Sequence, residues 1–291
     1  MEPRKWKNNY HLPEIDEIRE HIVSSYSNKL KFIEESHQYF IGDIEFECVS
    51  NIVDKWSSID EDAMLERCAM KALKYPDYKY FGMTKEEIAA QWKKAGDDAC
   101  RFGTGVHTFG EGCFYWFTGQ DERIPKSVRK QFTDDGPQPK NKHEEAVLKF
   151  WNDLPENFVP VLSETKVYNI EGTPYAGTFD ILFYYIDDKD PKKNGLIVMD
   201  YKTNNSLTSD YARGTNGRML VPFNDLYEES LSHYYLQFCL YQVPIEDLGY
   251  KVLGRRLIWL KPDGDYEKLK TPDISGRIRE ALKIKEHKIL N

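Results

Sequence analysis

The clearest pattern along this chain is a pair of short apolar runs separated by a polar segment. Residues 181–186 (ILFYYI) and 196–199 (LIVM) have the length and composition of buried β-strands. The residues between them, 187–195, are charged and contain Pro and Gly, which favour turns. Two strand-like runs joined by such a loop predict a β-hairpin. The polar residues before the first run and after the second are therefore expected at the same end of the hairpin.

Similar patterns predict the other elements. Helical spacing of apolar residues and one capping-box pattern, Thr84 with Glu87, indicate helices. Helices are expected at residues 11–28, 60–75, 84–101, 106–117, 144–151, 227–241 and 273–289. Strands are expected at residues 30–33 and 37–46, which would form a small hairpin, around Glu164, and at a last strand over 252–260. Residues 119–141 and 204–225 read as loops.

The order of these elements indicates the fold class. In the second half of the chain a helix is followed by three strands, another helix and another strand. This order predicts an α/β or α+β domain in which helices flank a central mixed β-sheet. Residues 1–100 are expected to form a helical N-terminal region with the small hairpin, packed on a core that spans residues 101–291.

Candidate chemistry lies at the polar end of the predicted hairpin. Asp180 precedes the first apolar run, and Asp200 and Lys202 follow the second. Side chains two apart on a strand point to the same face, so Asp200 and Lys202 should point together. The hairpin can bring Asp180 beside them. Asp-x-Lys at the end of a strand is common on solvated faces, but the pairing with Asp180 across a hairpin favours a functional site.

Two acids and a lysine at one sheet edge suit hydrolysis of phosphodiesters. Mg²⁺ prefers oxygen ligands and is usually held by one or two carboxylates together with substrate phosphate. A bound Mg²⁺ or Mn²⁺ lowers the pKa of its water and offsets charge on the phosphate. The lysine can orient or help to deprotonate the attacking water, or stabilise the developing charge.

These residues resemble the PD-(D/E)XK nuclease superfamily. The segments Gly177-Thr178-Phe179-Asp180 and Asp200-Tyr201-Lys202-Thr203 match its core motif, and they most resemble the RecB-like branch, which includes phage-type exonucleases. Phe179 stands where the name motif has Pro, as is common in that branch. The resemblance covers roughly residues 100–261 and implies a restriction-endonuclease-like nuclease core.

Further motifs extend the resemblance and imply a metal shell. The segment Gly103–His107 resembles the upstream helix motif of the branch, whose histidine binds metal, and Glu164 lies on the strand where the family often places an acid. The resemblance implies metal binding by His107, Asp180, Asp200 and the carbonyl of Tyr201, with Glu164 as a further acid. Packing or surface roles remain open for His107 and Glu164, and also for Glu111, one helical turn after His107.

Other residues are candidates for contacts with substrate. Gln237 and Tyr241 match the Gln-x-x-x-Tyr signature of the family, which implies contact with DNA or ordering of the lysine; the alternative is a helix packed on the sheet. Thr203 ends the core motif. Arg213 and Arg218 lie in the following glycine-containing loop and could contact phosphates. Aromatic residues in the N-terminal region could stack on unpaired bases or pack in the core: Tyr78, Tyr80, Phe81 and Trp92.

Charge and composition narrow the class of protein. The net charge of −8 excludes a generic basic DNA-binding protein, although an acidic metal site or local basic patches can reconcile that charge with DNA. No apolar run approaches the roughly 20 residues of a membrane span, so no membrane partner is expected. The five cysteines are widely spaced, without the clustered set that an iron–sulfur cluster needs, so we expect no cluster. Reduced thiols favour a cytoplasmic setting, and the resemblance implies that of a bacterial or phage-infected cell.

The expected activity is that of a Mg²⁺- or Mn²⁺-dependent deoxyribonuclease. The resemblance favours an exonuclease that degrades DNA from its ends in recombination, repair or replication, with a single-strand-annealing or replication protein as a conceivable partner. Two alternatives stay open: an endonuclease or structure-specific nuclease using the same site, and a nuclease fold that only binds DNA as an accessory protein. The sequence leaves the oligomeric state open.

Overall fold

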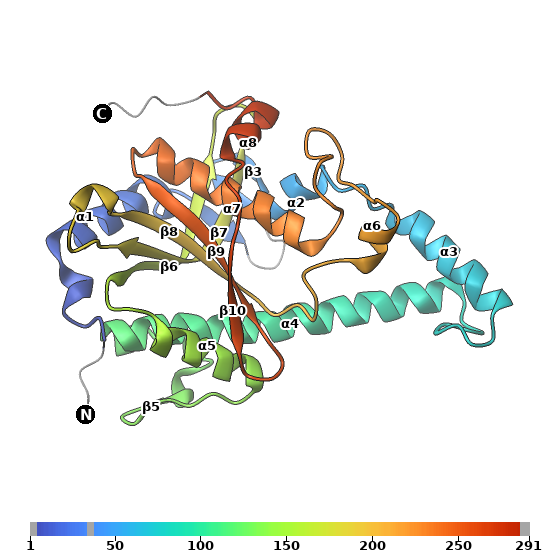
Figure 1. The fold of residues 1–291 in the computed structure, drawn as a ribbon, viewed down its shortest axis with the longest axis horizontal. Helices are drawn as coiled ribbons and strands as arrows, with labels where there is room; N and C mark the ends of the chain where they lie inside the picture. Colours follow the sequence, from blue (N-terminus) through green and yellow to red (C-terminus); the bar gives the residue numbers. More distant parts are fainter. Residues whose placement is uncertain (1–4, 34–37, 286–291) are drawn as a thin grey trace.

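A mixed β-sheet forms the centre of the molecule in a computed structural model that describes residues 5–33 and 38–285 (Figure 1). The eight-stranded sheet has the order β1-β2-β3-β7-β8-β9-β10, and β6 pairs with β7. Its strands are β1 (Lys31–Ile33), β2 (Gln38–Ile41), β3 (Ile44–Cys48), β6 (Phe158–Asn169), β7 (Tyr175–Tyr185), β8 (Gly195–Lys202), β9 (Val252–Leu260) and β10 (Tyr266–Lys270). A separate two-stranded sheet joins β4 (Phe132–Thr133) to β5 (Gly136–Pro137).

The pairing directions confirm the expected mixed sheet. Strands β6, β7 and β8 are antiparallel neighbours, whereas β8 and β9 run parallel. The predicted hairpin is β7 and β8. The prediction that β9 is the last strand was wrong, because β10 pairs antiparallel with it. Strand β10 lies at an edge of the sheet, where mostly solvated side chains leave no apolar run in the sequence.

Helices cover both faces of the sheet. They are α1 (Pro13–Ile22), α2 (Val49–Asp54), α3 (Glu61–Lys74), α4 (Lys85–Thr118), α5 (Lys142–Asp153), α6 (Asp210–Gly214), α7 (Ser230–Asp247) and α8 (Ser275–Leu282). In Figure 1, α4 and α5 lie below the sheet and α7 lies above it. Buried hydrogen bonds join these layers: Trp151 of α5 donates to the Tyr201 hydroxyl at 2.8 Å, and the Tyr175 hydroxyl donates to the Leu240 carbonyl at 2.9 Å.

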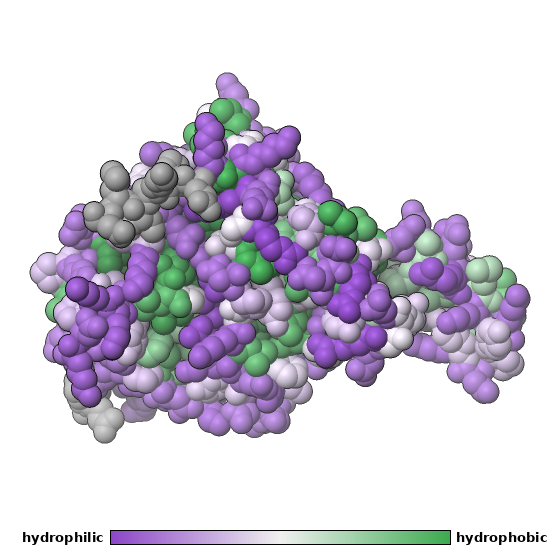
Figure 2. Space-filling model, turned by 45° about the horizontal axis from the view of Figure 1, so that its top comes forward, coloured by the Kyte–Doolittle hydropathy of each residue, from purple (hydrophilic) through white to green (hydrophobic). Residues whose placement is uncertain are grey.

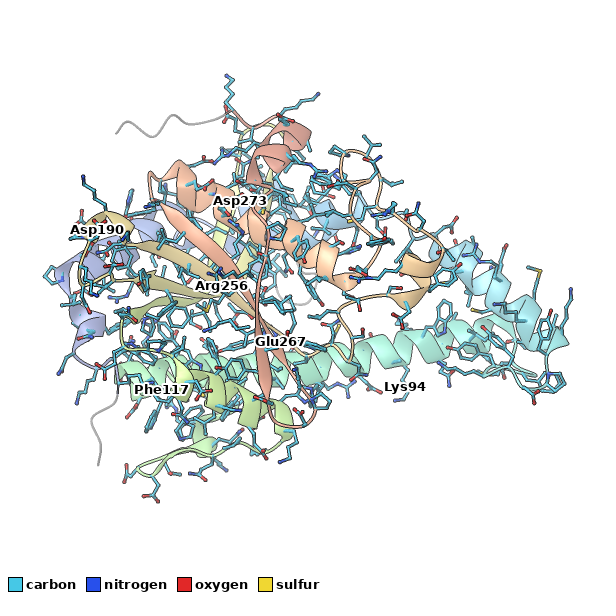
Figure 3. The ribbon with its side chains drawn as sticks, in the orientation of Figure 1. Lys94, Phe117, Asp190, Arg256, Glu267 and Asp273 are labelled. Atoms are coloured by element: carbon cyan, nitrogen blue, oxygen red, sulfur yellow. The ribbon has the colours of Figure 1, made fainter. Side chains whose placement is uncertain are left out.

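Helix α4 corrects the expectation of two separate helices over 84–101 and 106–117. It is a single helix of 34 residues that runs through Gly103 and Gly105. Glycine costs only about 1 kcal/mol in a helix interior, so two glycines do not end a helix that packing holds on both sides of them. Thr84 and Glu87 form the predicted capping box, and α4 ends at Gly119 with a positive φ of 79°. In Figure 3, Phe117 lies near the end of α4 beneath the sheet, whereas Lys94 points to solvent from the half that leads away from it.

The N-terminal region is joined to the central sheet. Strand β3 pairs in parallel with β7 through Cys48 and Ala176, so the small hairpin extends the main sheet. His37 of the expected hairpin lies outside the described residues, as does the end of the helix expected over 273–289. The expected domain boundary at residue 100 falls inside α4. Among residues 5–33 and 38–285, no helix combines the length and the apolar character that crossing a membrane requires.

Candidate functional site

The candidate site lies where strands β7 and β8 separate. Their antiparallel register runs from Tyr185–Gly195 to Ile181–Met199, so Asp180 and Asp200 occupy the next positions, just beyond the last pair of the register. Strand β8 continues through Lys202 beside β9 alone. Two aspartates thus face each other at the point where the strands part. The sequence places them there because each flanks one of the apolar runs that form the hairpin.

Asp180 makes two hydrogen-bonding contacts that fix its carboxylate. One of its oxygens, Oδ2, accepts the backbone N–H of Tyr201 at 2.7 Å and lies 3.1 Å from Nδ1 of His107. His107 reaches it from the middle of α4. This helix can approach β8 because Gly110 has no side chain: a Cβ there would lie 2.5 Å from the Tyr201 ring. The glycine therefore determines how close the histidine comes to the sheet.

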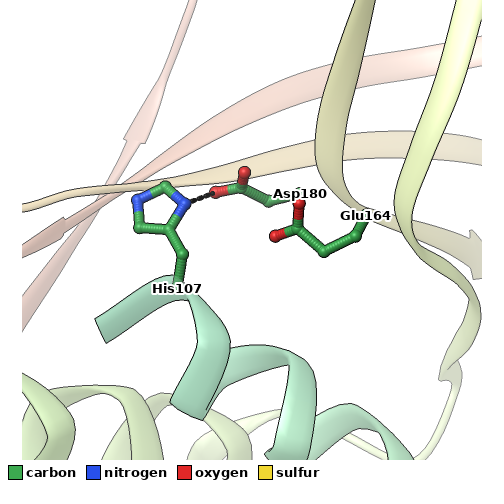
Figure 4. A group of neighbouring side chains, drawn as sticks. All are labelled: His107, Glu164 and Asp180. Atoms are coloured by element: carbon green, nitrogen blue, oxygen red, sulfur yellow. Dashed lines mark ion pairs between the residues drawn. The ribbon is translucent and has the colours of Figure 1, made fainter. Parts of the chain in front are cut away.

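Glu164 completes a group of possible metal ligands. It lies on β6 between two residues paired with β7, Ser163 with Ile181 and Thr165 with Phe179, and therefore faces Asp180. Its φ of 45° is rare for a residue other than glycine and marks local strain of the kind found at functional sites. One ligand atom each from His107, Glu164 and Asp180 lie within 4.8 Å of one another (Figure 4).

Asp200 and Lys202 form a buried ion pair beside this group. The Lys202 ammonium lies 2.9 and 3.0 Å from the two carboxylate oxygens of Asp200, which is 2% exposed. The Tyr234 ring of α7 lies 4.6 Å from the ammonium. The Asp200 carboxylate contacts Lys202 and is also hydrogen-bonded to Asp180, so it borders the group of His107, Glu164 and Asp180. Its expected role as a metal ligand stays a prediction. Tyr201 supplies its N–H to Asp180, while its ring is buried against α4 and α5.

Burial and mutual charge set the protonation of the cluster. Burial raises the pKa of Asp180, but the charges of His107 and Lys202 outweigh burial and hold it below its usual range. Burial and the Asp180 charge raise the pKa of Asp200 to about 7 and that of Glu164 well above its usual range. Burial lowers the pKa of His107, but the Asp180 charge outweighs it and brings the pKa to about 9. The pKa of Lys202 is likewise raised, because Asp200 and Asp180 outweigh burial.

Gln237 and Tyr241 lie next to the site but not against Lys202. The Gln237 amide donates to the Tyr241 hydroxyl at 2.9 Å, and both line a pocket of about 460 Å³ with Gly177 and Thr178 of β7. The opposite wall comes from β2, the end of β3 and α2. Thr178 and Asp180 are two apart on β7, so the pocket borders the acidic cluster. The residue of α7 that contacts Lys202 is Tyr234. Helical spacing alone could not show which residue of this helix would reach the lysine.

The other residues expected to contact substrate differ in whether they already have partners within the protein. Thr203 follows Lys202 beside α4, where a Cβ added to Gly103 would lie 3.6 Å from its hydroxyl oxygen. Arg213 already pairs with Glu229 through two contacts of 2.8 and 2.9 Å. Arg218 lies 3.7 Å from the centre of the Tyr227 ring and donates to the Asp225 carbonyl. Both arginines therefore stabilise the loop after β8, and Thr203 is closer to the acidic cluster along the chain.

Glu111 is a further acid whose role the sequence did not decide. It lies one helical turn after His107, and its charge contributes to the raised pKa of Glu164. Burial raises the pKa of Glu111, while Tyr115 and Arg123 oppose that shift. The cluster thus has an acidic neighbour on α4 as well as on the sheet.

Replacing Glu164 by glutamine should stabilise the protein when no metal is added. A carboxyl whose pKa is raised in the folded state loses stability as the pH rises from its unfolded pKa toward its folded pKa. At pH 8 we therefore expect a higher thermal unfolding midpoint for Glu164→Gln than for the wild type, and at about pH 4 no difference. With Mn²⁺ the wild type should gain more stability than the variant. A variant that is less stable at pH 8 without metal would contradict this arrangement of charges.

Gly105 offers a test of whether substrate passes over α4. A Cβ at Gly105 or at Gly96 would meet no atom within 4 Å, so Gly105→Ala and Gly96→Ala should each stabilise the helix by about 1 kcal/mol. Gly105 lies beside His107, whereas Gly96 lies in the distant half of α4. We expect both variants to have a higher thermal unfolding midpoint than the wild type. A substrate that passes over α4 near His107 would meet the added methyl group only in Gly105→Ala, so weaker binding by that variant alone would place the substrate there. Equal binding by the two variants would show that no substrate approaches Gly105.

Comparison with known proteins does not assign the chain to a family. No profile of a known protein family matches it, and a sequence search of curated proteins finds no match.

Proposed function

We propose that this protein is a divalent-metal-dependent deoxyribonuclease with a PD-(D/E)XK-like core. The observation that carries the proposal is the meeting of three ligand residues, His107, Glu164 and Asp180, beside the buried Asp200–Lys202 pair. Three acids close together repel one another, and natural proteins keep such a cluster at a cost in stability. A bound cation would offset that repulsion.

The donor set fits Mg²⁺ or Mn²⁺. His107, Glu164 and Asp180 would hold the ion, with Asp200 and the Tyr201 carbonyl as further candidates; an imidazole among carboxylates suits Mn²⁺ particularly well. When bound, the cation supplies charge to the scissile phosphate and acidifies a water molecule. Lys202 is held by Asp200 with a raised pKa and is therefore protonated at neutral pH. An ammonium in that state can donate hydrogen bonds to a water molecule or to the phosphate, so its role is to orient and to stabilise charge.

Substrate contacts follow from the surroundings of the site. The pocket beside Thr178, Gln237 and Tyr241 offers hydroxyl and amide groups next to the acidic cluster. Such neutral polar groups suit the sugar and base of a nucleotide whose phosphate lies at the cation. We take DNA as the substrate and attack from a DNA end as the mode, as the resemblance to RecB-like exonucleases implies.

Metal binding should strengthen as the pH rises. His107 binds a cation only as the neutral imidazole, and its pKa of about 9 means that a proton must leave before metal enters at lower pH. Asp200, with a pKa of about 7, adds to the same trend. We expect the Mn²⁺ affinity of the wild type to increase between pH 6 and pH 9, with proton release measurable by calorimetry in buffers of different ionisation enthalpy. A pH-independent affinity would argue against His107 as a ligand.

Cleavage of two DNA forms tests the activity. End-labelled linear DNA and a covalently closed circle are incubated with the protein and Mg²⁺, Mn²⁺ or EDTA. Metal-dependent loss of the linear form alone supports the exonuclease and shows which end is attacked. Cutting of the circle would instead indicate an endonuclease that uses the same site. Binding of DNA without cleavage in either metal would instead indicate an accessory protein that only binds DNA.

A further inference from the structure

Helix α3 and the first half of α4 form an arm that projects from the body of the molecule (Figure 1). The arm has its own small core, built around the buried residues Ala72, Tyr80 and Ile88. Trp92 on α4 donates a hydrogen bond of 2.7 Å to the Tyr80 hydroxyl, which fastens the connecting loop to the helix. Of the two roles that the sequence left open for Tyr80, the structure shows packing in this small core, because the residue is only 7% exposed. The arm is an ordered element with a defined tip.

The tip of the arm, residues 70–85, exposes large apolar side chains. Met70, Leu73, Tyr75 and Phe81 are between 51% and 78% exposed. Apolar and polar residues alternate over the projecting arm in Figure 2. Burying such side chains is favourable, so four of them on one tip are a feature typical of an interaction site. Turn hydrogen bonds, from Tyr78 N–H to the Tyr75 carbonyl and from Phe81 N–H to the Tyr78 carbonyl, fix the backbone that carries the exposed Tyr75 and Phe81.

The charge of the tip is opposite to that of the protein. Residues 70–85 contain four lysines (71, 74, 79 and 85) and one aspartate, a net charge of +3 in a chain of net charge −8. Lys85 pairs with Glu66 of α3 at 3.4 Å, and Glu86 and Glu87 follow in the first turn of α4. Lys79 lies 4.6 Å from the Tyr80 ring. Lysines interleaved with exposed aromatic rings are the combination that binds single-stranded nucleic acid, because cations contact phosphates and rings stack on bases.

Helix α4 connects the tip directly to the candidate site. Lys85 at its start and His107 are 22 residues apart on one continuous helix, which at 1.5 Å per residue is about 33 Å. A stacked strand with one phosphate every 3.4 Å covers this length in about ten nucleotides, and a more extended strand does so in fewer. One strand can therefore reach from the site to the tip.

We propose that the tip of the arm binds single-stranded DNA about ten nucleotides from the phosphate at the acidic cluster. Tyr75 and Phe81 stack on unpaired bases, and Lys71, Lys74 and Lys79 contact the phosphates on either side. This inference rests on the proposed function, because that function places one phosphate of the strand at the acidic cluster. The inference itself concerns DNA binding and not cleavage. It predicts that affinity depends on strand length, because a strand too short to span the arm cannot touch both places.

Binding measured in EDTA tests the tip without any cleavage. The affinities of a labelled 20-nucleotide strand and a tetranucleotide are compared for the wild type, for Tyr75→Ala combined with Phe81→Ala, and for Tyr75→Phe. We expect the double variant to bind the 20-nucleotide strand at least about thirtyfold more weakly, because two stacked bases are lost at about 1–3 kcal/mol each. The tetranucleotide, which can bind the tip alone, should also be weakened, and Tyr75→Phe should bind like the wild type. A matched control removes two equally exposed apolar side chains elsewhere, Ile44→Ala with Ile170→Ala, and should bind normally.

Lysine variants test the contribution of charge to DNA binding. The same samples would also reveal whether the tip binds a different partner. Neutralising Lys74 and Lys79 should reduce the salt dependence of log K for the long strand by roughly 0.7 for each phosphate that is no longer neutralised. Unchanged binding of the long strand by the aromatic double variant would overturn the proposal. Loss of self-association with unchanged binding would instead assign the tip to a second copy of the chain. Failure of the nuclease proposal can be distinguished from failure of this one, because the wild type would then not cleave DNA in Mg²⁺ or Mn²⁺.

Discussion

Asp180→Asn should abolish metal-dependent cleavage of DNA, reducing the rate by at least about a thousandfold. Asparagine has the same shape and keeps an oxygen that can accept the Tyr201 N–H, so the strands should stay in register. It lacks the negative charge that faces His107 and Glu164, so the Mn²⁺ affinity should fall together with the rate. The measurements are the initial rate on end-labelled linear DNA and a calorimetric Mn²⁺ titration.

The control for this variant lies at the other end of the same hairpin. Asp188 is exposed in the β7–β8 loop, next to the region where Figure 3 labels Asp190, far from the acidic cluster. Asp188→Asn removes the same charge from the protein and should leave both rate and metal binding unchanged. Wild-type cleavage by Asp180→Asn, with Mn²⁺ binding intact, would exclude Asp180 from the mechanism.

Lys202→Met should also reduce cleavage by about a thousandfold, but through a different step. Methionine fills a similar volume beside the Tyr234 ring without the charge that orients water and stabilises the phosphate. His107, Glu164 and Asp180 are untouched, and a repelling cation is removed, so Mn²⁺ binding should be kept or strengthened. The two variants thus separate binding of the ion from the chemistry that follows.

Lys202→Met should also change how the free energy of unfolding depends on pH. Without Lys202 the buried Asp200 carboxylate loses the cation that lowers its pKa most, and only His107 still lowers it, so its pKa should rise above about 7. A carboxyl with a raised folded pKa costs more stability as the pH increases. Lys202→Met should therefore lose more stability at pH 8 than at pH 5, measured by denaturant unfolding without metal. A pH-independent loss would mean that the ammonium does not balance Asp200.

The β7–β8 hairpin was predictable because its two apolar runs are mostly buried and have polar residues on both sides. The same pattern brings Asp180, Asp200 and Lys202 to one place, since strand periodicity is regular and the loop between the strands is short. His107 was expected near them only through the resemblance. Its position depends on α4 running unbroken past Gly105, which local propensity does not predict.

The division of roles within the site could not be predicted from sequence. Asp200 turns to Lys202, and Glu164 faces Asp180 through a backbone conformation with positive φ; both depend on the packing of three strands. Strand β10 was missed because an edge strand with solvated side chains has no apolar signal. The exposed tip of the arm was likewise hidden, because Tyr80 and Phe81 are adjacent aromatics and only the fold buries one and exposes the other.

The most direct test of the metal-dependent nuclease is the rate at which EDTA-treated protein releases label from end-labelled linear DNA as Mn²⁺ is added. We predict no release in EDTA, a saturable increase with Mn²⁺, and no increase at any Mn²⁺ concentration for Asp180→Asn. Release that is equally fast in EDTA, or no release by the wild type at any concentration of Mn²⁺ or Mg²⁺, would contradict the assignment of His107, Glu164 and Asp180 to a catalytic metal site.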